Sequence, residues 1–250
     1  MECRFIDSGV GKAYFNMGLD EAILEHVSDS RSPATLRFYG WAPRAVSIGY
    51  FQSMREEVDV DACFKDGVDV VRRITGGGAV YHDRELTYSY IAKEDAVPDD
   101  ILESYRLICG GLIRGFNGLG LKAEFAPLND ILSGGRKISG NAQTRRMGCV
   151  MQHGTILLDV DVDRMFRYLK VPSEKMRDKA VKDVKERVTS LKHLTGKEVP
   201  CGKAAEAFKK GFAEALKLRL KPASPTPSEL AQAQSLAECK YFTLEWNDKR

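Results

Sequence analysis

The sequence predicts an α+β fold, in which a mixed, largely antiparallel sheet is packed with helices. Strand-like segments cluster between residues 34 and 158, and short turns join most of them with few helices between. This order lacks the strand–helix alternation of a doubly wound parallel sheet. The longest helical pattern, over residues 99–119, repeats apolar residues every three or four positions and can cover one face of the sheet.

Composition limits the classes of function. The chain has 250 residues, of which 43% are hydrophobic and 29% charged, which suits one large globular domain. A net charge of +3 is too small to indicate nucleic-acid or membrane binding by itself. The N-terminus lacks the apolar core of a signal peptide, and no apolar run approaches the ~20 residues of a membrane span. The six cysteines are scattered without a Cys-x-x-Cys pair, so we expect reduced thiols and a cytosolic protein.

Period and turn residues divide the first third of the chain into short elements. We expect a strand at 5–7, a helix at 14–27, strands at 34–39 and 45–50 on either side of the turn 40–43, a short helix at 60–64 and a buried strand at 68–71.

The remaining elements follow in the same way. We expect strands at 86–91, 122–125 and 129–132, an extended polar segment at 136–146, a strand at 151–158, and helices at 99–119, 161–169, 202–218 and 228–239. Gly110, Gly111 and Gly115 weaken the long helix, and we expect them to allow close packing on the sheet. The charge-rich segment 172–187 is typical of a solvated face.

The segment 72–83 is the strongest candidate for a binding site. It reads Arg-Arg-Ile-Thr-Gly-Gly-Gly-Ala-Val-Tyr-His-Asp and lies between two expected strands, with His82 and Asp83 as a titratable pair at its end. Successive backbone N–H groups in such a turn can form a concave anion site, and arginine adds a fork of donors. The segment lacks the Gly-Lys-Ser/Thr of a P-loop and does not open a helix. The alternative is a glycine-rich hairpin with exposed arginines.

A second candidate lies in the motif Gly-Arg-Lys-Ile-Ser-Gly, residues 135–140. Lys137 is either an ordinary surface lysine or an ammonium directed into a pocket. A hairpin would bring Asp130 close to it, and this carboxylate could hold Mg²⁺. Downstream, His153 precedes a small residue on an expected strand.

These motifs together resemble the lipoate–protein ligase A family. The order Arg-Arg-x-x-Gly-Gly-Gly-Ala-Val-Tyr-His-Asp, Leu-Asn-Asp, Gly-Arg-Lys-Ile-Ser-Gly, His-Gly-Thr and a late Glu-Trp-Asn extends over nearly the whole chain. The resemblance implies the class II aminoacyl-tRNA synthetase/biotin ligase-like fold. It also implies a single catalytic domain over 1–250, with a core at about 1–190 and a helical part at about 191–250. We expect no accessory domain of the kind that many ligases carry.

The resemblance implies that ATP and Mg²⁺ activate lipoate to lipoyl-AMP. The lipoyl group then passes to a lysine of lipoyl domains of 2-oxoacid dehydrogenases or of the glycine-cleavage H protein, with a separate accessory polypeptide as a possible requirement. It assigns catalysis to Lys137 and Mg²⁺ binding to Asp130. Contacts to ATP or the adenylate fall on Arg73, Gly76, Gly77, Gly78, Ala79, Val80, Tyr81, His82 and Lys137. Further candidates at the site are Arg72, Asn129, Ser139, Gly140 and His153.

The main alternative is an octanoyltransferase of the same fold, which moves an octanoyl chain from acyl carrier protein through a cysteine thioester without ATP. In one branch the resemblance places this cysteine in an inserted loop before the lysine motif; here 127–130 is short and holds none. In the other branch the cysteine follows the His-Gly strand; here 169–172 holds none. Cys149 is the one thiol near the site motifs, so the sequence favours the ligase. A third alternative is a non-catalytic acyl- or protein-binding module.

Overall fold

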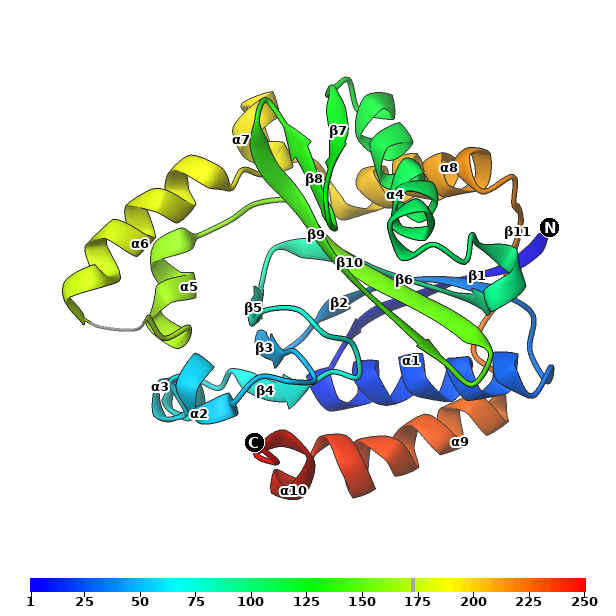
Figure 1. Ribbon diagram of the computed structural model, residues 1–250, viewed down its shortest axis with the longest axis horizontal. Helices are drawn as coiled ribbons and strands as arrows, with labels where there is room; N and C mark the ends of the chain where they lie inside the picture. Colours follow the sequence, from blue (N-terminus) through cyan, green and yellow to red (C-terminus); the bar gives the residue numbers. More distant parts are fainter. Residues whose placement is uncertain (172–173) are drawn as a thin grey trace.

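An eight-stranded sheet forms the centre of the molecule (Figure 1). The computed structural model describes residues 1–171 and 174–250, so Pro172 and Ser173 of the charge-rich segment lie outside it. The strand order is β11 (Arg219–Pro222), β1 (Glu2–Gly11), β2 (Thr35–Trp41), β6 (Glu85–Lys93), β10 (Cys149–Leu157), β9 (Arg136–Arg146), β8 (Asp130–Ser133) and β7 (Ala123–Ala126). Strand β1 runs parallel to both neighbours, and the other pairs are antiparallel, which confirms the predicted fold class.

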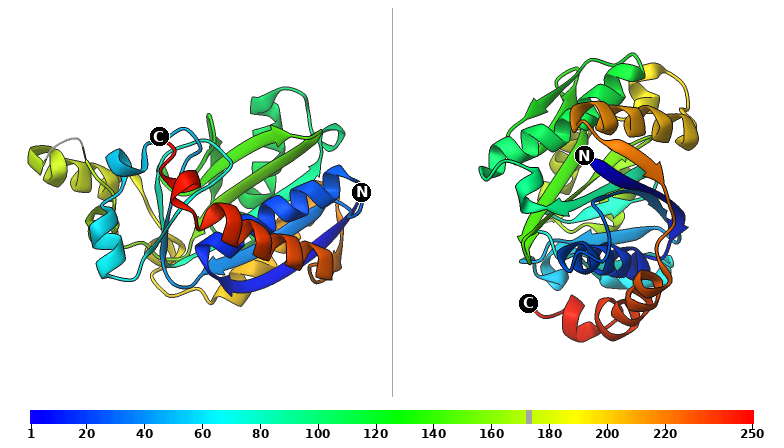
Figure 2. Two further views of the ribbon diagram at one scale, coloured as in Figure 1. Left: turned by 90° about the horizontal axis from the view of Figure 1, so that it is seen from below. Right: turned by 90° about the vertical axis from the view of Figure 1, so that its right-hand side faces the viewer.

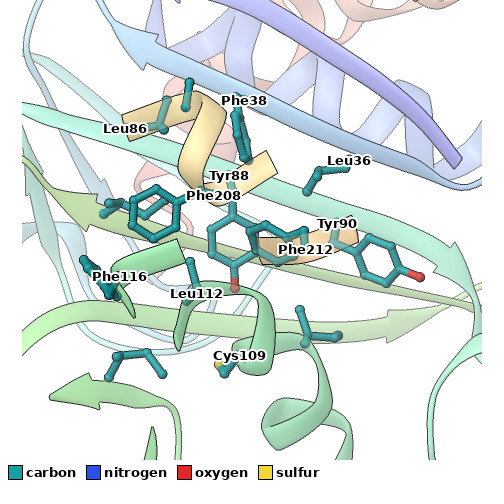
Figure 3. Packing of buried hydrophobic residues seen from close by; sticks show 14 of the residues in the cluster. Leu36, Phe38, Leu86, Tyr88, Tyr90, Cys109, Leu112, Phe116, Phe208 and Phe212 are labelled. Atoms are coloured by element: carbon teal, nitrogen blue, oxygen red, sulfur yellow. The ribbon is translucent and has the colours of Figure 1, made fainter. Parts of the chain in front are cut away.

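Helices cover both faces of this sheet because its central strands alternate apolar residues between them. Along β2, Phe38 belongs to the core on one face and Tyr39 to the core on the other. Helices α4 (Ile101–Gly118) and α8 (Cys201–Ala215) cover the first face. Helix α1 (Ala13–Ser28) covers the second, and α9 (Pro227–Leu236) packs on the outer side of α1 (Figure 2). Figure 3 shows aromatic rings from the sheet and from α4 and α8 meeting in the first core.

The glycines of α4 pack against a helix, so the prediction that they pack on the sheet was wrong. A Cβ on Gly111 would lie 2.4 Å from the Phe212 ring, and one on Gly115 would lie 2.2 Å from the Phe208 ring. Both rings project from α8. The glycines therefore allow α8, which is distant from α4 in the sequence, to approach α4 closely. The two phenylalanines of α8 are buried as a result.

A second, three-stranded sheet carries residues 72–83, which we call the glycine-rich segment. Its order is β4 (Asp69–Arg72), β3 (Ala45–Ile48) and β5 (Val80–His82), with β3 parallel to β4 and antiparallel to β5. The expected neighbours β2 and β3 thus belong to different sheets. Strand β5 was not predicted, because three residues give too little alternation to recognise. The glycines Gly76–Gly78 therefore connect two strands that lie on opposite sides of β3.

Shorter elements complete the chain. They are α2 (Met54–Glu57), α3 (Val60–Lys65), η1 (Glu94–Ala96), α5 (Val162–Tyr168), α6 (Glu174–Arg187), α7 (Leu191–Thr195), η2 (Ala237–Tyr241) and α10 (Leu244–Asn247). The part after residue 191, expected to be helical, also contains β11, an exposed edge strand with too few apolar residues to stand out. Among the described residues, no helix combines the length and apolarity needed to cross a bilayer.

Candidate active site

A cavity of about 430 Å³ lies between the glycine-rich segment, strands β9 and β10, and helix α5. Most of its wall is apolar, with Trp41 from the central sheet and Phe166 from α5 among the larger side chains. Polar groups reach it from two sides. Arg73 and His82 come from the glycine-rich segment, and Lys137 comes from β9. The cavity is thus an apolar chamber with cationic and titratable groups at its edges.

Arg73 holds the glycine-rich segment in place. Its Nε donates to Thr75 Oγ1 at 3.2 Å, and its Nη1 donates to Ser47 O at 3.0 Å and Ser47 Oγ at 3.1 Å. Its Nη2 donates to the carbonyl oxygens of Gly76 and Gly78 at 2.7 and 2.8 Å. All five N–H groups of the guanidinium are therefore used within the protein. Burial lowers the pKa of Arg73 to about 10, so the group still carries its charge at neutral pH.

The backbone of the turn Gly76–Gly78 packs directly against Gly49. A Cβ at that position would lie 2.0 Å from the carbonyl oxygen of Gly77, so only glycine fits beneath the turn. Gly77 has φ of +92°, a conformation that a side chain would strain. Gly77 and Gly78 line the cavity together with Ala79, Val80, Tyr81 and His82, whereas Gly76 lies outside the lining residues.

Arg72 does not join the site, although it is adjacent in sequence. Its backbone N–H donates to Asn247 Oδ1 at 2.6 Å, and its Nη2 donates to Asn247 O at 2.7 Å. Its Nε donates to Trp246 O at 3.0 Å, and its Nη1 donates to three carbonyl oxygens within residues 49–52. Arg72 is therefore a buried link between β4 and the C-terminal helix α10.

Lys137 faces the cavity from the hairpin of β8 and β9. A register shift between Ile131 and Leu132 interrupts the pairing of these strands beside it. Its Nζ lies 2.7 Å from Asp130 Oδ1, the proximity that a hairpin predicts, and its side chain remains 40% exposed. A Cβ on Gly140 would lie 2.9 Å from the Lys137 Nζ, so the glycine leaves room for the ammonium.

Asp130, the residue expected to bind Mg²⁺, lies beside Lys137, and its metal binding stays a prediction. Its carboxylate is paired with Lys137 and lies outside the lining residues of the cavity. Within residues 1–171 and 174–250, no group of three or more His, Cys, Asp or Glu side chains gathers, whereas a Mg²⁺ ion that also binds phosphates needs only one or two carboxylates. Asp130 is thus placed to orient the lysine.

Asn129 and Ser139, two further candidates near Lys137, differ in whether they line the cavity. Asn129 lines the cavity and is cross-linked to Asn141: its amide donates to Asn141 O, and the Asn141 amide donates to Asn129 O at 2.8 Å. A Cβ on Gly154 would lie 2.2 Å from Asn141 Oδ1, which explains the small residue after His153. Ser139 is fully buried and does not line the cavity.

His82 has partners that the sequence did not indicate. Its Nδ1 lies 2.7 Å from Glu85 Oε1 and its Nε2 lies 2.8 Å from Ser47 Oγ, while its ring stacks on Trp41 with centroids 3.9 Å apart. The expected partner, Asp83, instead faces Arg164 at 3.6 Å. Sequence reasoning missed Ser47 and Glu85. The one usable signal was spacing, because Glu85 follows His82 by three residues.

His153 lies under the glycine-rich segment. Its Nε2 is 2.7 Å from Thr75 Oγ1, and its Nδ1 is 3.8 Å from Asp20 Oδ2. Burial lowers the pKa of His153 below its usual value, against the opposing charge of Asp20. Burial would raise the pKa of Asp20, but the fully buried Arg37 and His153 hold it below its usual value. The neutral imidazole therefore supports Thr75, which in turn contacts Arg73.

The cysteines lie away from this chamber. None of the six is among the described residues that line the cavity. Cys149 is buried in the core beneath α1, and burial raises the pKa of its thiol. A thiol that is buried and protonated is a poor nucleophile, so Cys149 has neither the position nor the ionisation that a thioester intermediate needs.

Comparison with known proteins identifies the family. The model of the lipoyl protein ligase A/B catalytic domain matches residues 12–213. This chain belongs to that family. It is similar to octanoyltransferase LipM of Geobacillus kaustophilus (strain HTA426), with 42% identity over 99% of this chain and 98% of the relative. It is 40% identical to octanoyltransferase LipM of Bacillus subtilis (strain 168) over the same shares.

A solved structure shares the fold along the whole chain. It is a bi-partite lipoate protein ligase from Thermoplasma acidophilum, which superimposes with a TM-score of 0.89 at 34% identity and covers 99% of this chain and 96% of that one. The family therefore includes relatives under both names.

The expectation of an ATP-dependent lipoate ligase is corrected by the curated relatives. They match over nearly their full length and are named octanoyltransferases, which was the stated alternative. The sequence favoured the ligase because residues 127–130 and 169–172 hold no cysteine, and the relatives overturn that prediction. The alignments nevertheless extend over 272 positions against the 250 residues here, so at least 22 positions of these relatives have no counterpart in this chain.

Proposed function

We propose that the chain is an octanoyltransferase that moves an octanoyl group from a carrier-protein thioester to a lysine amine of a lipoyl domain. The full-length similarity to the octanoyltransferases carries this proposal. The cavity supports it, since an apolar chamber of about 430 Å³ is of the size that holds small-molecule ligands.

The cavity walls suit a medium-length alkyl chain. Trp41, Met165 and Phe166 offer apolar surface, and each buried CH₂ contributes about 0.8 kcal/mol. The affinity of such walls depends on the length and apolarity of the alkyl chain. Because the alkyl chain occupies the apolar surface, the reacting carbonyl lies where that surface ends. The polar groups at this end are those of the glycine-rich segment and Lys137.

Lys137 has the position and charge to act on that carbonyl. Acyl transfer develops negative charge on the carbonyl oxygen, and a fixed cation beside it lowers the barrier. The ammonium is anchored by Asp130 at 2.7 Å and keeps enough exposure to meet a substrate. Arg73 adds a second, buried positive charge among the residues that line the cavity.

The proposed reaction takes its energy from the thioester of the donor. Neither ATP nor Mg²⁺ is needed, because the acyl group arrives already activated. The acceptor is proposed as a lipoyl domain or H protein, and the T. acidophilum ligase was studied with its own E2 lipoyl domain.

A direct assay tests the proposal. The chain is incubated with octanoyl-acyl carrier protein and a lipoyl domain, without ATP, and the domain is weighed by intact-protein mass spectrometry. We expect a mass increase of one octanoyl group and a fall of about 10²-fold in rate for Lys137→Ala. Lys122→Ala, an exposed lysine two elements away, is the matched control and should keep the wild-type rate. Modification that occurs with free acid and ATP and never with the thioester would overturn the proposal.

A further inference from the structure

A serine, a histidine and a glutamate form a hydrogen-bonded chain in the wall of the cavity. Ser47 Oγ lies 2.8 Å from His82 Nε2, and His82 Nδ1 lies 2.7 Å from Glu85 Oε1. All three side chains are buried, yet all three line the cavity. Ser47 comes from the central strand of the small sheet, and His82 comes from the strand paired with it.

The direction of these hydrogen bonds follows from the groups around Glu85. Thr87 Oγ1 donates to Glu85 Oε1 at 2.7 Å, and Trp41 Nε1 donates to Thr87 Oγ1 at 2.8 Å. A carboxylate only accepts, so in the neutral imidazole the Glu85 contact places the proton on Nδ1 and leaves a free lone pair on Nε2. In that tautomer the Ser47 hydroxyl donates to His82. This is the polarity in which a histidine can remove a proton from a serine.

The surroundings fix the imidazole and favour a charged serine oxygen. Trp41 stacks on the His82 ring with an interplanar angle of 16°, which prevents it from tilting away. Arg73 Nη1 donates to Ser47 Oγ at 3.1 Å. A guanidinium that donates to the hydroxyl oxygen stabilises negative charge there, and it leaves the hydroxyl proton to point at His82.

We propose that Ser47 is the acyl-accepting nucleophile of this chain, with His82 as its base and Glu85 as the residue that orients the histidine. The inference rests on the proposed acyl-transfer function and says how that transfer proceeds without a cysteine in the cavity. Ser47, His82 and Glu85 correspond to the nucleophile, the base and the residue that orients the base, and all three line the cavity.

The reaction balances as two displacements. In the first, His82 Nε2 takes the Ser47 proton while Oγ attacks the thioester carbonyl. The C–O bond forms, the C–S bond breaks, and His82 returns the proton to the departing thiolate of the donor. In the second, the neutral lysine amine of the acceptor attacks the ester carbonyl. The C–N bond forms, the C–O bond breaks, and the amine proton passes through His82 back to Ser47. The acyl group moves from thioester to oxygen ester to amide, so each product is the less activated compound.

Trapping the intermediate tests the inference. The wild-type chain is mixed with octanoyl-acyl carrier protein in the absence of acceptor, quenched in acid and mapped by peptide mass spectrometry. We expect one octanoyl group on Ser47, and we expect Ser47→Ala to lose both the adduct and at least 10²-fold of the transfer rate. Ser47→Cys keeps a nucleophile at the same place, and its adduct should become a thioester that neutral hydroxylamine cleaves. Ser89→Ala, a buried serine of the central sheet outside the cavity, should behave as wild type.

The outcomes separate this inference from the proposed function. Transfer by Ser47→Ala at the wild-type rate, or an adduct on any other residue, overturns the role of Ser47 while leaving the transferase intact. A wild-type chain that transfers nothing from the thioester overturns the proposed function itself. Thermal unfolding of each variant is measured in parallel, and if Ser47→Ala unfolds early, loss of the mapped adduct in His82→Gln takes its place as the deciding result.

Discussion

Lys137 and Asp130 face each other across the β8–β9 hairpin, with 2.7 Å between Nζ and Oδ1. If the carboxylate acts only by positioning the ammonium, its effect must depend on the lysine. We expect Asp130→Asn to slow octanoyl transfer roughly tenfold and Lys137→Ala to slow it about 10²-fold. The double variant should be no slower than Lys137→Ala alone, because residues that share one interaction are not additive. Rates that multiply in the double variant would contradict this coupling.

The close approach of Gly49 to the glycine-rich segment gives a second prediction. A Cβ on Gly49 would lie 2.0 Å from the carbonyl oxygen of Gly77, so Gly49→Ala must displace the loop that Arg73 holds. We expect transfer to be lost and the unfolding free energy to fall by about 1–3 kcal/mol.

Gly202 offers a matched comparison for that substitution. It lies in α8, where a Cβ would have no neighbour within 4 Å, so Gly202→Ala should keep full activity and stability or gain slightly. Urea denaturation and the transfer assay on both variants provide the check. Equal behaviour of the two would show that the loop yields easily.

The ion pair of Arg4 and Glu229 predicts sensitivity to acid. The two groups are joined by hydrogen bonds of 2.9 and 2.6 Å and are buried. Burial would raise the pKa of Glu229, but Arg4, the Thr226 amide and Ser32 outweigh it and lower the pKa from 4.5 to about 2. The resulting stabilisation of about 3 kcal/mol is present above pH 4.5 and is lost as the pH falls towards 2.

Glu229→Gln isolates this contribution. The variant should be less stable than the wild type at neutral pH, and its unfolding free energy should change less between pH 4.5 and 2. Chemical denaturation at a series of pH values measures both slopes. Parallel slopes would assign the acid sensitivity to other carboxylates.

Asn247 is predicted to stabilise the site from a distance. Its Oδ1 accepts from the buried N–H of Arg72, and its Nδ2 donates to the carbonyl oxygens of Tyr241 and Thr243. Asn247→Ala leaves these groups unsatisfied, so we expect a loss of about 1–3 kcal/mol in unfolding free energy. Gln234→Ala, on the exposed side of α9, should change it by less than about 0.5 kcal/mol. An unchanged midpoint for Asn247→Ala would show that water replaces the lost partners.

Local patterns predicted the parts of the site that neighbours in sequence create. The approach of Asp130 to Lys137 follows from a hairpin of a few residues, and the helical period marked α1 and α4. The pairing of Ser47 with His82 could not be predicted in this way, because it depends on the register of β3 and β5 across 35 positions of sequence.

Packing between elements that are distant in the sequence could not be predicted from local patterns either. The glycines of α4 could be recognised as a contact surface, but nothing in their own segment indicated that the partner was α8 and its phenylalanines. Arg72 and Arg73 have the same side chain and adjacent positions, and strand geometry sends them to opposite surroundings. The different roles of these two arginines therefore depend on the positions of the three-stranded sheet and of α10.

The link from Arg72 to Trp246 and Asn247 spans 174 and 175 positions of sequence. During synthesis the strands of both sheets up to β10 leave the ribosome well before these two residues do. A nascent chain can therefore form its central sheet while the base of the glycine-rich segment still lacks its last partners. Arg72 therefore obtains its full set of hydrogen bonds only after Trp246 and Asn247 have been added and have folded against β4.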